Sequence, residues 1–136
     1  MDLAAARQFL SQHHHAVLAT QRRDGRPQLS PVTVAVDAAD RAIISSRETA
    51  YKTLNLRRHP QASLCVFEAG FFGPWMQIDG RAEIIALPEA MELLIDYYRR
   101  AAGEHPHWDD YRQAMERERR VLIRLTLDHV GPSRKG

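Results

Sequence analysis

The sequence predicts a mainly β domain in which antiparallel strands form a closed or partly closed barrel with helices against its ends. Short apolar segments with a period of two recur along the chain, and short turns join several of them, which favours antiparallel pairing. These segments outnumber the strands that one flat sheet would comfortably hold in a small domain. With 136 residues and no internal repeat or linker-like stretch, the chain is expected to form a single domain over residues 1–136.

The composition excludes several classes of protein. Hydrophobic residues make up 44% of the chain and charged residues 26%, which is typical of globular domains and argues against disorder. The single cysteine, Cys65, cannot form an internal disulfide and fits a reducing compartment. There is no apolar run of the ~20 residues that span a bilayer and no signal-peptide pattern, so a cytoplasmic location is expected. A net charge of +2 does not by itself indicate nucleic-acid binding.

The first half of the chain predicts a helix followed by antiparallel strands. Leu3, Phe9 and Leu10 lie at helical spacing on one face. Asp24-Gly25 is a hairpin signal between two apolar segments, because the turn needs residues that tolerate positive φ. The elements expected here are a helix over 2–12 and strands over 16–19, 29–36 and 42–46.

The second half alternates helices and strands. The segment around Met76 and Ile78 has the clearest period of two in the sequence, which is typical of a strand with one buried face. Pro60 and Gly103 mark helix ends, and Pro88 marks a helix start. The elements expected here are helices over 47–58, from 88 to 103 and from about 109, and strands over 62–67, 76–86 and 121–127.

A basic cluster follows the strand that ends at Ser45-Ser46. The free backbone N–H groups and the positive dipole end of a strand-to-helix junction favour an anion, and Lys52 lies one turn inside the expected helix. A phosphate site is one interpretation, and a solvated helix face with ordinary surface bases is the other. The cluster consists of Arg47, Lys52, Arg57, Arg58 and His59, with Glu48 as its one carboxylate.

Other motifs are less specific. His13, His14 and His15 are consecutive, so on a strand they point to alternating faces and cannot converge on one metal ion. The aromatic turn that contains Phe72 and Trp75 fits a hydrophobic plug, a dimer contact or a wall for a planar ring. The sequence holds no GxGxxG, Walker or GxSxG motif, which argues against the commonest nucleotide-binding and hydrolase folds.

Four stretches occur in an order that resembles a known family. They are AVLATQRRDGRPQLSPV, YKTLNLRRHPQASLCV, MQIDGRAEI and YRRAAGEHPHWDDYRQAMERERRVLIRL. Together they resemble the pyridoxamine 5′-phosphate oxidase-like split β-barrel family, and more closely its branch that depends on the deazaflavin coenzyme F420. The resemblance runs from about Phe9 to Gly131. It implies a six-stranded antiparallel Greek-key split β-barrel and an obligate homodimer, with cofactor sites in two grooves at the dimer interface.

The resemblance also implies a set of cofactor-binding residues. Lys52 would hold the cofactor phosphate, helped by Ser45, Ser46, Asn55 and Arg57. Relatives often carry a second basic residue two positions before this lysine, where this chain has Ala50, and Arg47 is the candidate substitute. The residues expected along the ring system are Ser30, Pro31, Val32 and Thr33 from one strand and Trp75, Met76 and Gln77 from another.

The implied function is hydride transfer between reduced F420 and a conjugated small-molecule acceptor, with no residue nominated as the general acid. Two alternatives share the fold: an FMN-dependent oxidase or reductase, and a non-catalytic protein that binds F420, flavin or haem. The Arg-Gln pair that flavin-using oxidases carry near the position of Trp75 is missing, which disfavours FMN. A nucleic-acid binder is a further alternative that the small net charge disfavours. The expected partners are a second copy and the acceptor, without nucleic acid, metal or membrane span.

Overall fold

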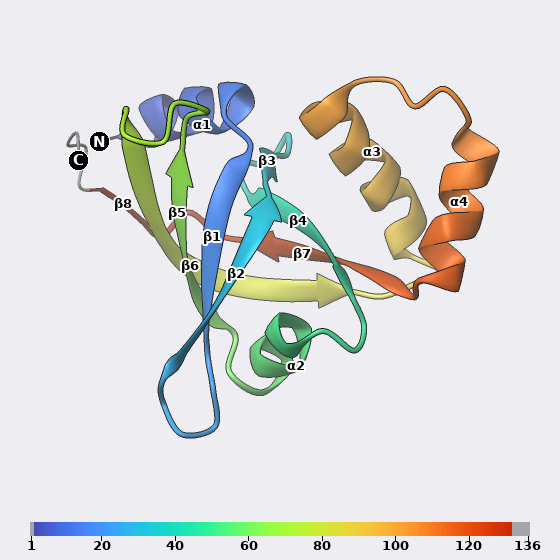
Figure 1. The fold of residues 1–136 in the computed structure, drawn as a ribbon, viewed down its shortest axis with the longest axis horizontal. Helices are drawn as coiled ribbons and strands as arrows, with labels where there is room; N and C mark the ends of the chain where they lie inside the picture. The colour runs from blue at the N-terminus through green and yellow to red at the C-terminus, as the bar shows by residue number, and fades with distance from the viewer. Residues whose placement is uncertain (1, 132–136) are drawn as a thin grey trace.

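The computed structural model describes residues 2–131, which form a curled antiparallel sheet and four helices (Figure 1). The helices are α1 (Leu3–Gln12), α2 (Tyr51–Arg58), α3 (Ala90–Ala102) and α4 (Trp108–Arg117). The strands are β1 (His15–Gln21), β2 (Pro27–Thr33), β3 (Ala35–Val36), β4 (Ala42–Arg47), β5 (Gln61–Phe67), β6 (Trp75–Ile85), β7 (Arg120–Leu125) and β8 (His129–Val130).

The sheet confirms the predicted antiparallel split barrel but corrects its strand count. Its hydrogen-bonded path contains seven strands, in the order β2-β1-β5-β6-β7-β4-β3, and β8 pairs with β6 beside this path. The expected number of six is wrong because the strand predicted over 29–36 changes partner at Val34, so that β2 pairs with β1 and β3 pairs with β4. Since β2 and β3 are consecutive in the chain, the two ends of the path meet at Val34 and the sheet curls around a core.

The barrel core follows from the alternation of apolar side chains. Leu18, Leu64 and Ile78 are direct partners across β1, β5 and β6, and each is at most 1% exposed. Ile44 and Ile123 make an equivalent buried pair between β4 and β7. A strand with a period of two sends these side chains inward and leaves their chain neighbours on the outer surface.

Helices close both ends of the barrel, as the sequence predicts. The apolar face of α1 contributes Ala6 and Leu10 to the barrel core, and α2 contributes Leu56. Figure 1 shows α1 at the top of the barrel and α2 at the bottom. The carboxylate of Asp2 caps α1 by accepting a hydrogen bond from the backbone N–H of Ala5 at 2.8 Å, which satisfies one free donor of the first turn.

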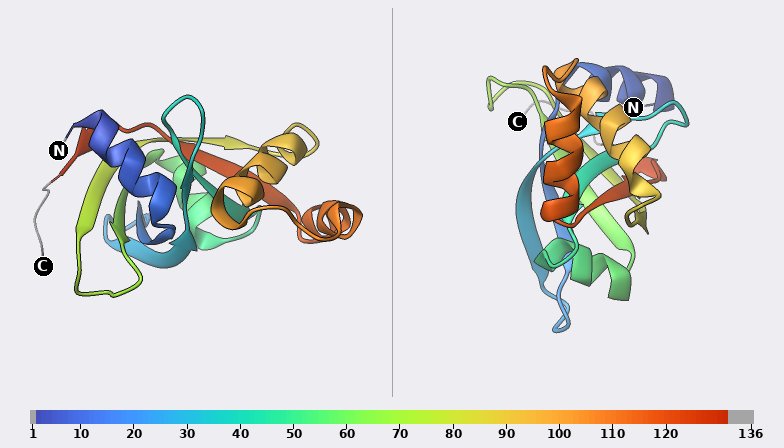
Figure 2. Two further views of the ribbon diagram at one scale, coloured as in Figure 1. Left: turned by 90° about the horizontal axis from the view of Figure 1, so that it is seen from above. Right: turned by 90° about the vertical axis from the view of Figure 1, so that its right-hand side faces the viewer.

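The α3–α4 pair covers a different surface. Side chains that point outward from the barrel, such as Ile43 of β4 and Leu122 of β7, are buried against α3 and α4 in a second core. Figure 2 shows these two helices together on one side of the barrel. The α3–α4 pair does not cover the outer surface of β1, β2, β5 and β6. This surface carries exposed apolar side chains, including Leu29, which is 61% exposed.

The structure also shifts one helix boundary. The helix predicted over 47–58 begins only at Tyr51, because β4 continues through Arg47, which pairs with Arg120 of β7. The predicted hairpin at Asp24-Gly25 is confirmed: Gly25 has a φ of +87°, and Arg22 donates its backbone N–H to the carbonyl of Arg26 at 2.8 Å.

Candidate functional site

A cavity of about 340 Å³ lies where α2 and the α3–α4 pair meet β2, β4 and β7. We call it the Lys52 pocket. It brings together five residues that the sequence predicts to bind a cofactor and five that it does not. The lining consists of Pro31, Val32, Thr33, Ser45 and Lys52, which were predicted, and of Tyr97, Tyr98, Tyr111, Met115 and Arg120, which were not.

Lys52 is the cation that the sequence singled out, and the structure places it in this pocket. It is the second residue of α2 and is half-buried. Burial, and secondly the positive charge of Arg120, lower the pKa of Lys52. A bound anion would therefore offset the cost of burying the charged Lys52 ammonium group near Arg120. Ser45 points into the same pocket because β4 alternates, with Ile44 and Ser46 facing the barrel core.

Arg120, the first residue of β7, is a second cation in the Lys52 pocket. Its Nε and Nη2 groups both donate to Oε1 of Glu118, at 3.0 and 2.8 Å. The sequence carried one partial signal, since the alternation of β7 puts Arg120 on the outer face with Leu122. Which outer residue lies beside Lys52 depends on the β4–β7 register, and the local sequence pattern does not contain that register.

Aromatic side chains of α3 and α4 form the opposite wall of the pocket. Tyr97 donates its hydroxyl to the backbone carbonyl of Thr33 at 2.9 Å, which ties α3 to β2. Tyr111 donates its hydroxyl to the carbonyl of Leu94 at 2.8 Å, and burial raises the pKa of Tyr111 to about 12. These phenols therefore stay neutral at physiological pH and give the pocket a largely uncharged wall.

Two predicted phosphate-binding residues, Ser46 and Asn55, face the barrel instead. Ser46 is fully buried, and its hydroxyl lies 2.8 Å from the Thr53 hydroxyl. Asn55 donates its side-chain amide to the hydroxyl of Thr20 at 3.1 Å. These contacts attach α2 to the end of the barrel, and neither side chain lines the Lys52 pocket.

Arg47, Arg57 and Ser30 also lie outside the pocket lining. Arg57 pairs with Glu48, and Arg47 pairs with Glu118 at 3.4 Å. Ser30 donates its hydroxyl to the side chain of Gln28 at 3.1 Å. All three therefore have protein partners in this structure, and their roles toward a cofactor stay predictions.

The predicted residues of β6 lie away from the Lys52 pocket, because β1 and β5 separate β6 from β2. Met76 is fully buried in the barrel core. Trp75 is half-buried opposite Phe67, and Gln77 donates its side-chain amide to Asp79 at 3.2 Å. Within one chain, Trp75 and Gln77 are thus on the outer surface of the sheet, and strands β1 and β5 lie between them and the segment 31–33 of β2.

A second cavity connects these surfaces. It measures about 370 Å³ and shares the segment 31–33 of β2 with the Lys52 pocket. Its other lining residues include Val17 and Phe67, and Phe67 is the direct strand partner of Trp75. The surface is therefore continuous from Lys52 across β2 and toward β6.

A cavity of about 610 Å³ lies at the turn end of the β1–β2 hairpin and is less suited to an anion. Its lining contains the carboxylates of Asp79 and Asp128 as well as Arg81. A hydrogen bond that Ser63 donates at 2.6 Å is the main reason that the pKa of Asp79 is lowered, which keeps this carboxyl group charged. We therefore place the candidate anion site in the smaller Lys52 pocket.

Two further observations concern metal ions and membranes. Among residues 2–131, no three His, Cys, Asp or Glu side chains are grouped so that they could hold a metal ion. His14, from the histidine run, instead makes a 2.8 Å hydrogen bond through Nδ1 with the carbonyl of Val34. None of the described helices has the length and apolar character needed to cross a membrane.

Comparison with known proteins agrees with this architecture. A model of the pyridoxamine 5′-phosphate oxidase family matches residues 3–133. A conserved hypothetical protein from Mycobacterium tuberculosis has a similar structure, with 23% identity, a TM-score of 0.77 and coverage of 96% of this chain and 82% of that protein. An F420 reductase is similar with 20% identity, a TM-score of 0.69 and coverage of 91% and 94%.

A protein with a different role shares the same fold. The haem storage protein HutZ from Vibrio cholerae matches with 17% identity, a TM-score of 0.71 and coverage of 100% of this chain and 98% of that protein. At these identities the structural likeness establishes the fold alone. Because the fold serves a reductase and a haem storage protein, the function has to be argued from the residues of the site.

Proposed function

This chain belongs to the pyridoxamine 5′-phosphate oxidase family, and on that premise we propose that it is an F420-dependent oxidoreductase. In this proposal it transfers a hydride between reduced F420 and a conjugated small-molecule acceptor. One observation carries the proposal: Lys52, Ser45 and the segment 31–33 of β2 line one pocket whose lining includes no carboxylate. A cation, a hydroxyl donor and an extended strand in one pocket suit a phosphate-bearing planar cofactor.

The residues present fit the phosphate of such a cofactor. Lys52 supplies a point charge, and the hydroxyl of Ser45 supplies a hydrogen-bond donor from the facing strand. A charge-assisted contact of this kind contributes roughly 1.5–3 kcal/mol. The lowered pKa of Lys52 supports the same role, because a phosphate would favour the charged form that burial and Arg120 disfavour.

The remaining pocket residues would orient the ring and exclude water. Val32 and Pro31 offer an apolar strand surface, and Tyr98 and Met115 stand opposite from α3 and α4. F420, when bound, supplies the hydride chemistry of its deazaflavin ring, and the protein supplies binding and orientation. Holding the two reactants in a fixed geometry contributes much of the rate in such enzymes.

We also propose that the active form is a homodimer. A cavity of about 340 Å³ is near the lower limit of roughly 300–1,000 Å³ for ligand sites, so one chain offers limited room for a cofactor of this size. The exposed outer surface around Leu29 would bury apolar area against a second copy, whose Trp75 and Gln77 would complete the site. Sedimentation equilibrium tests this: the native chain should be dimeric and Leu29→Lys monomeric. A dimeric Leu29→Lys variant would place the interface elsewhere.

The alternatives on the same fold are FMN-dependent redox chemistry and non-catalytic binding of F420, flavin or haem. Parallel titrations with F420 and FMN, followed by hydride-transfer assays on enones and quinones, separate them. Tighter binding of F420 and turnover of at least one acceptor would support the proposal. A yellow purified protein that prefers FMN would favour the flavin alternative. Tight binding without turnover of any acceptor would favour a storage or sequestration role.

A further inference from the structure

Two cations from distant parts of the chain converge on the Lys52 pocket. Lys52 comes from α2 and Arg120 from the start of β7, and both line the same cavity. Like charges in a partly buried site repel each other, and here the charge of Arg120 contributes to the lowered pKa of Lys52. Glu118 pairs with Arg120 from outside the pocket lining, and among residues 2–131 no carboxylate pairs with Lys52. Such an arrangement keeps a net positive charge in the pocket and favours an anionic ligand.

The guanidinium of Arg120 is held from one side only. Nε and Nη2 donate to the same carboxylate oxygen, Oε1 of Glu118. Within residues 2–131, Nη1 of Arg120 donates no hydrogen bond, so both of its N–H groups and the second N–H of Nη2 remain for a ligand. Glu118 itself is fixed at the end of α4, where it is the C-cap residue.

We propose that Arg120 and Lys52 together bind a phosphate dianion and that Glu118 is the positioning residue that aims Arg120 at it. This inference rests on the proposed phosphate subsite and adds Arg120 and Glu118, which do not belong to the basic cluster around Lys52. A planar fork beside a point charge suits a phosphate monoester, whose oxygens accept several directed hydrogen bonds.

Arg47 is the natural comparison, because it lies directly opposite Arg120 on β4 and also contacts Glu118. The two arginines differ in what surrounds them. The Arg47 side chain is 58% exposed and lies outside the pocket lining, whereas that of Arg120 is 25% exposed and belongs to the lining. Arg47 has the same charge, lies on the neighbouring strand and contacts the same carboxylate, so it is the comparison variant. The family resemblance suggests Arg47 as the second phosphate cation, and our proposal assigns that role to Arg120 instead.

A purely structural alternative makes a different prediction. If the contact between Arg120 and Glu118 only joins the end of α4 to β7, its loss would lower stability and leave phosphate affinity unchanged. The test therefore has to measure anion binding at Lys52 directly, independent of any cofactor and of turnover.

The sequence permits such a measurement, because its only lysines are Lys52 and Lys135. In a Lys135→Arg background, NMR of isotope-labelled lysine reports on Lys52 alone. Inorganic phosphate is the probe. We expect it to shift the Lys52 signal saturably in the background protein and in Arg47→Gln. Arg120→Gln should weaken phosphate binding about tenfold or more.

A pH titration of the same signal supplies a second readout. The pKa of Lys52 should rise in Arg120→Gln and stay unchanged in Arg47→Gln, because Arg120 is the cation that faces Lys52. Glu118→Ala should weaken phosphate binding more than Glu118→Gln, which keeps an oxygen acceptor for Arg120. Far-ultraviolet circular dichroism confirms that each variant is folded.

The outcomes are separable from those of the proposed function. Equal phosphate affinity in the background protein and Arg120→Gln, or equal losses in Arg47→Gln and Arg120→Gln, would overturn the two-cation site. Equal affinity in Glu118→Ala and Glu118→Gln would remove the positioning role. Phosphate binding that depends on Arg120 in a protein that binds neither F420 nor FMN would keep this inference and reject the proposed function.

Discussion

The side-chain amide of Asn55 donates a hydrogen bond to the hydroxyl of Thr20 at 3.1 Å, and both groups are buried where α2 meets β1. Asn55 and Lys52 belong to the same two turns of helix, yet they point to different surroundings. Asn55 holds α2 on the barrel, and Lys52 faces the pocket beside β2 and β4. Substitutions on this helix should therefore separate into effects on folding and effects on binding.

Replacing Asn55 should reduce stability. Asn55→Ala leaves the buried Thr20 hydroxyl without its partner, and an unsatisfied buried polar group costs roughly 1–3 kcal/mol. Urea denaturation measures the free energy of unfolding. Leu54→Ala, at a half-exposed neighbouring position of α2, is the control and should cost much less. Similar losses in the two variants would show that the Asn55–Thr20 bond contributes little.

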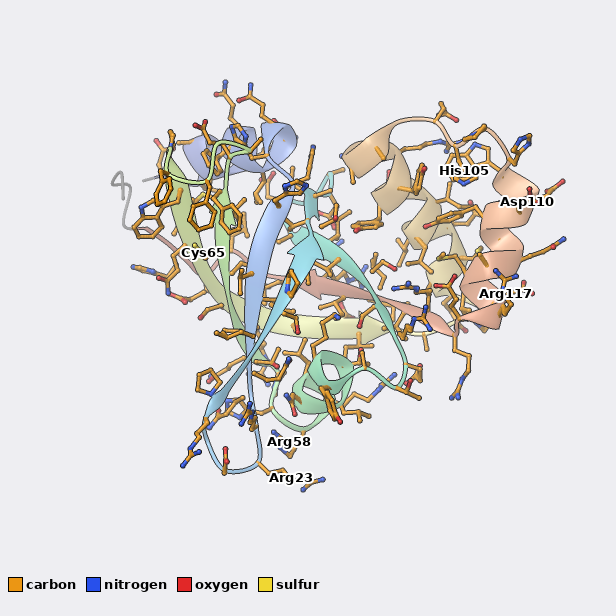
Figure 3. The ribbon with its side chains drawn as sticks, in the orientation of Figure 1. Arg23, Arg58, Cys65, His105, Asp110 and Arg117 are labelled. Atoms are coloured by element: carbon orange, nitrogen blue, oxygen red, sulfur yellow. The ribbon has the colours of Figure 1, made fainter. Side chains whose placement is uncertain are left out.

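Replacing Lys52 should reduce binding without unfolding the protein. Lys52→Ala removes the proposed phosphate contact and should weaken F420 binding by about tenfold or more, as the loss of a charge-assisted contact of 1.5–3 kcal/mol implies. Fluorescence titration measures the affinity. Arg117→Ala removes a positive charge from α4 outside the pocket lining and is the control (Figure 3). Equal affinities in Lys52→Ala and the native chain would exclude Lys52 from the site.

Gly80 should tolerate no side chain. A Cβ atom at this position would lie 1.8 Å from the backbone carbonyl oxygen of Thr126, which cannot move without breaking the contact between Thr126 and Arg81. Gly80→Ala should therefore cost at least the ~1–3 kcal/mol that is typical of overpacked positions. Thermal denaturation measures this loss. Gly70→Ala, whose nearest neighbour would be 3.6 Å away, should leave the midpoint nearly unchanged.

Asp79 should contribute an acid-sensitive part of the stability. The hydrogen bond from Ser63, followed by those from Gln77 and His129, lowers the pKa of Asp79 below its ordinary value of 3.8. A carboxyl group with a lowered pKa stabilises the folded state above its unfolded pKa, and this contribution disappears as the pH falls through the folded pKa. Asp79→Asn should thus be less stable than the native chain at pH 7.

The difference between these two proteins should shrink as the pH falls below about 4, near the pKa of an unfolded aspartate. Urea denaturation at a series of pH values measures it. The exposed Asp110 of α4 provides the control variant Asp110→Asn (Figure 3). A constant difference between native chain and Asp79→Asn down to pH 2.5 would show that ionisation of Asp79 is not the cause.

Part of the site could be predicted because it depends on local signals. Lys52 and Ser45 lie within one strand-to-helix connection, and the structure brings both into the same pocket. Ser46 and Asn55 come from the same connection but face the barrel, because strand alternation and helix rotation turn them inward. The sequence therefore located the stretch of chain that forms the site. Which of its side chains face the pocket and which face the barrel depends on how α2 is oriented on the barrel.

Amino-acid order by itself determined which side chains enter the barrel, since a period of two along a strand is a local property; Leu64 and Ile78 follow from it. Tertiary structure decided that Val34 divides a strand between two partners and that Arg120, rather than Arg47, shares a pocket with Lys52. Both outcomes depend on pairing between segments far apart in the chain. Which strands pair, and in which register, depends on how the assembled sheet curls and which faces it buries. The sequence of one segment alone therefore does not determine the pairing.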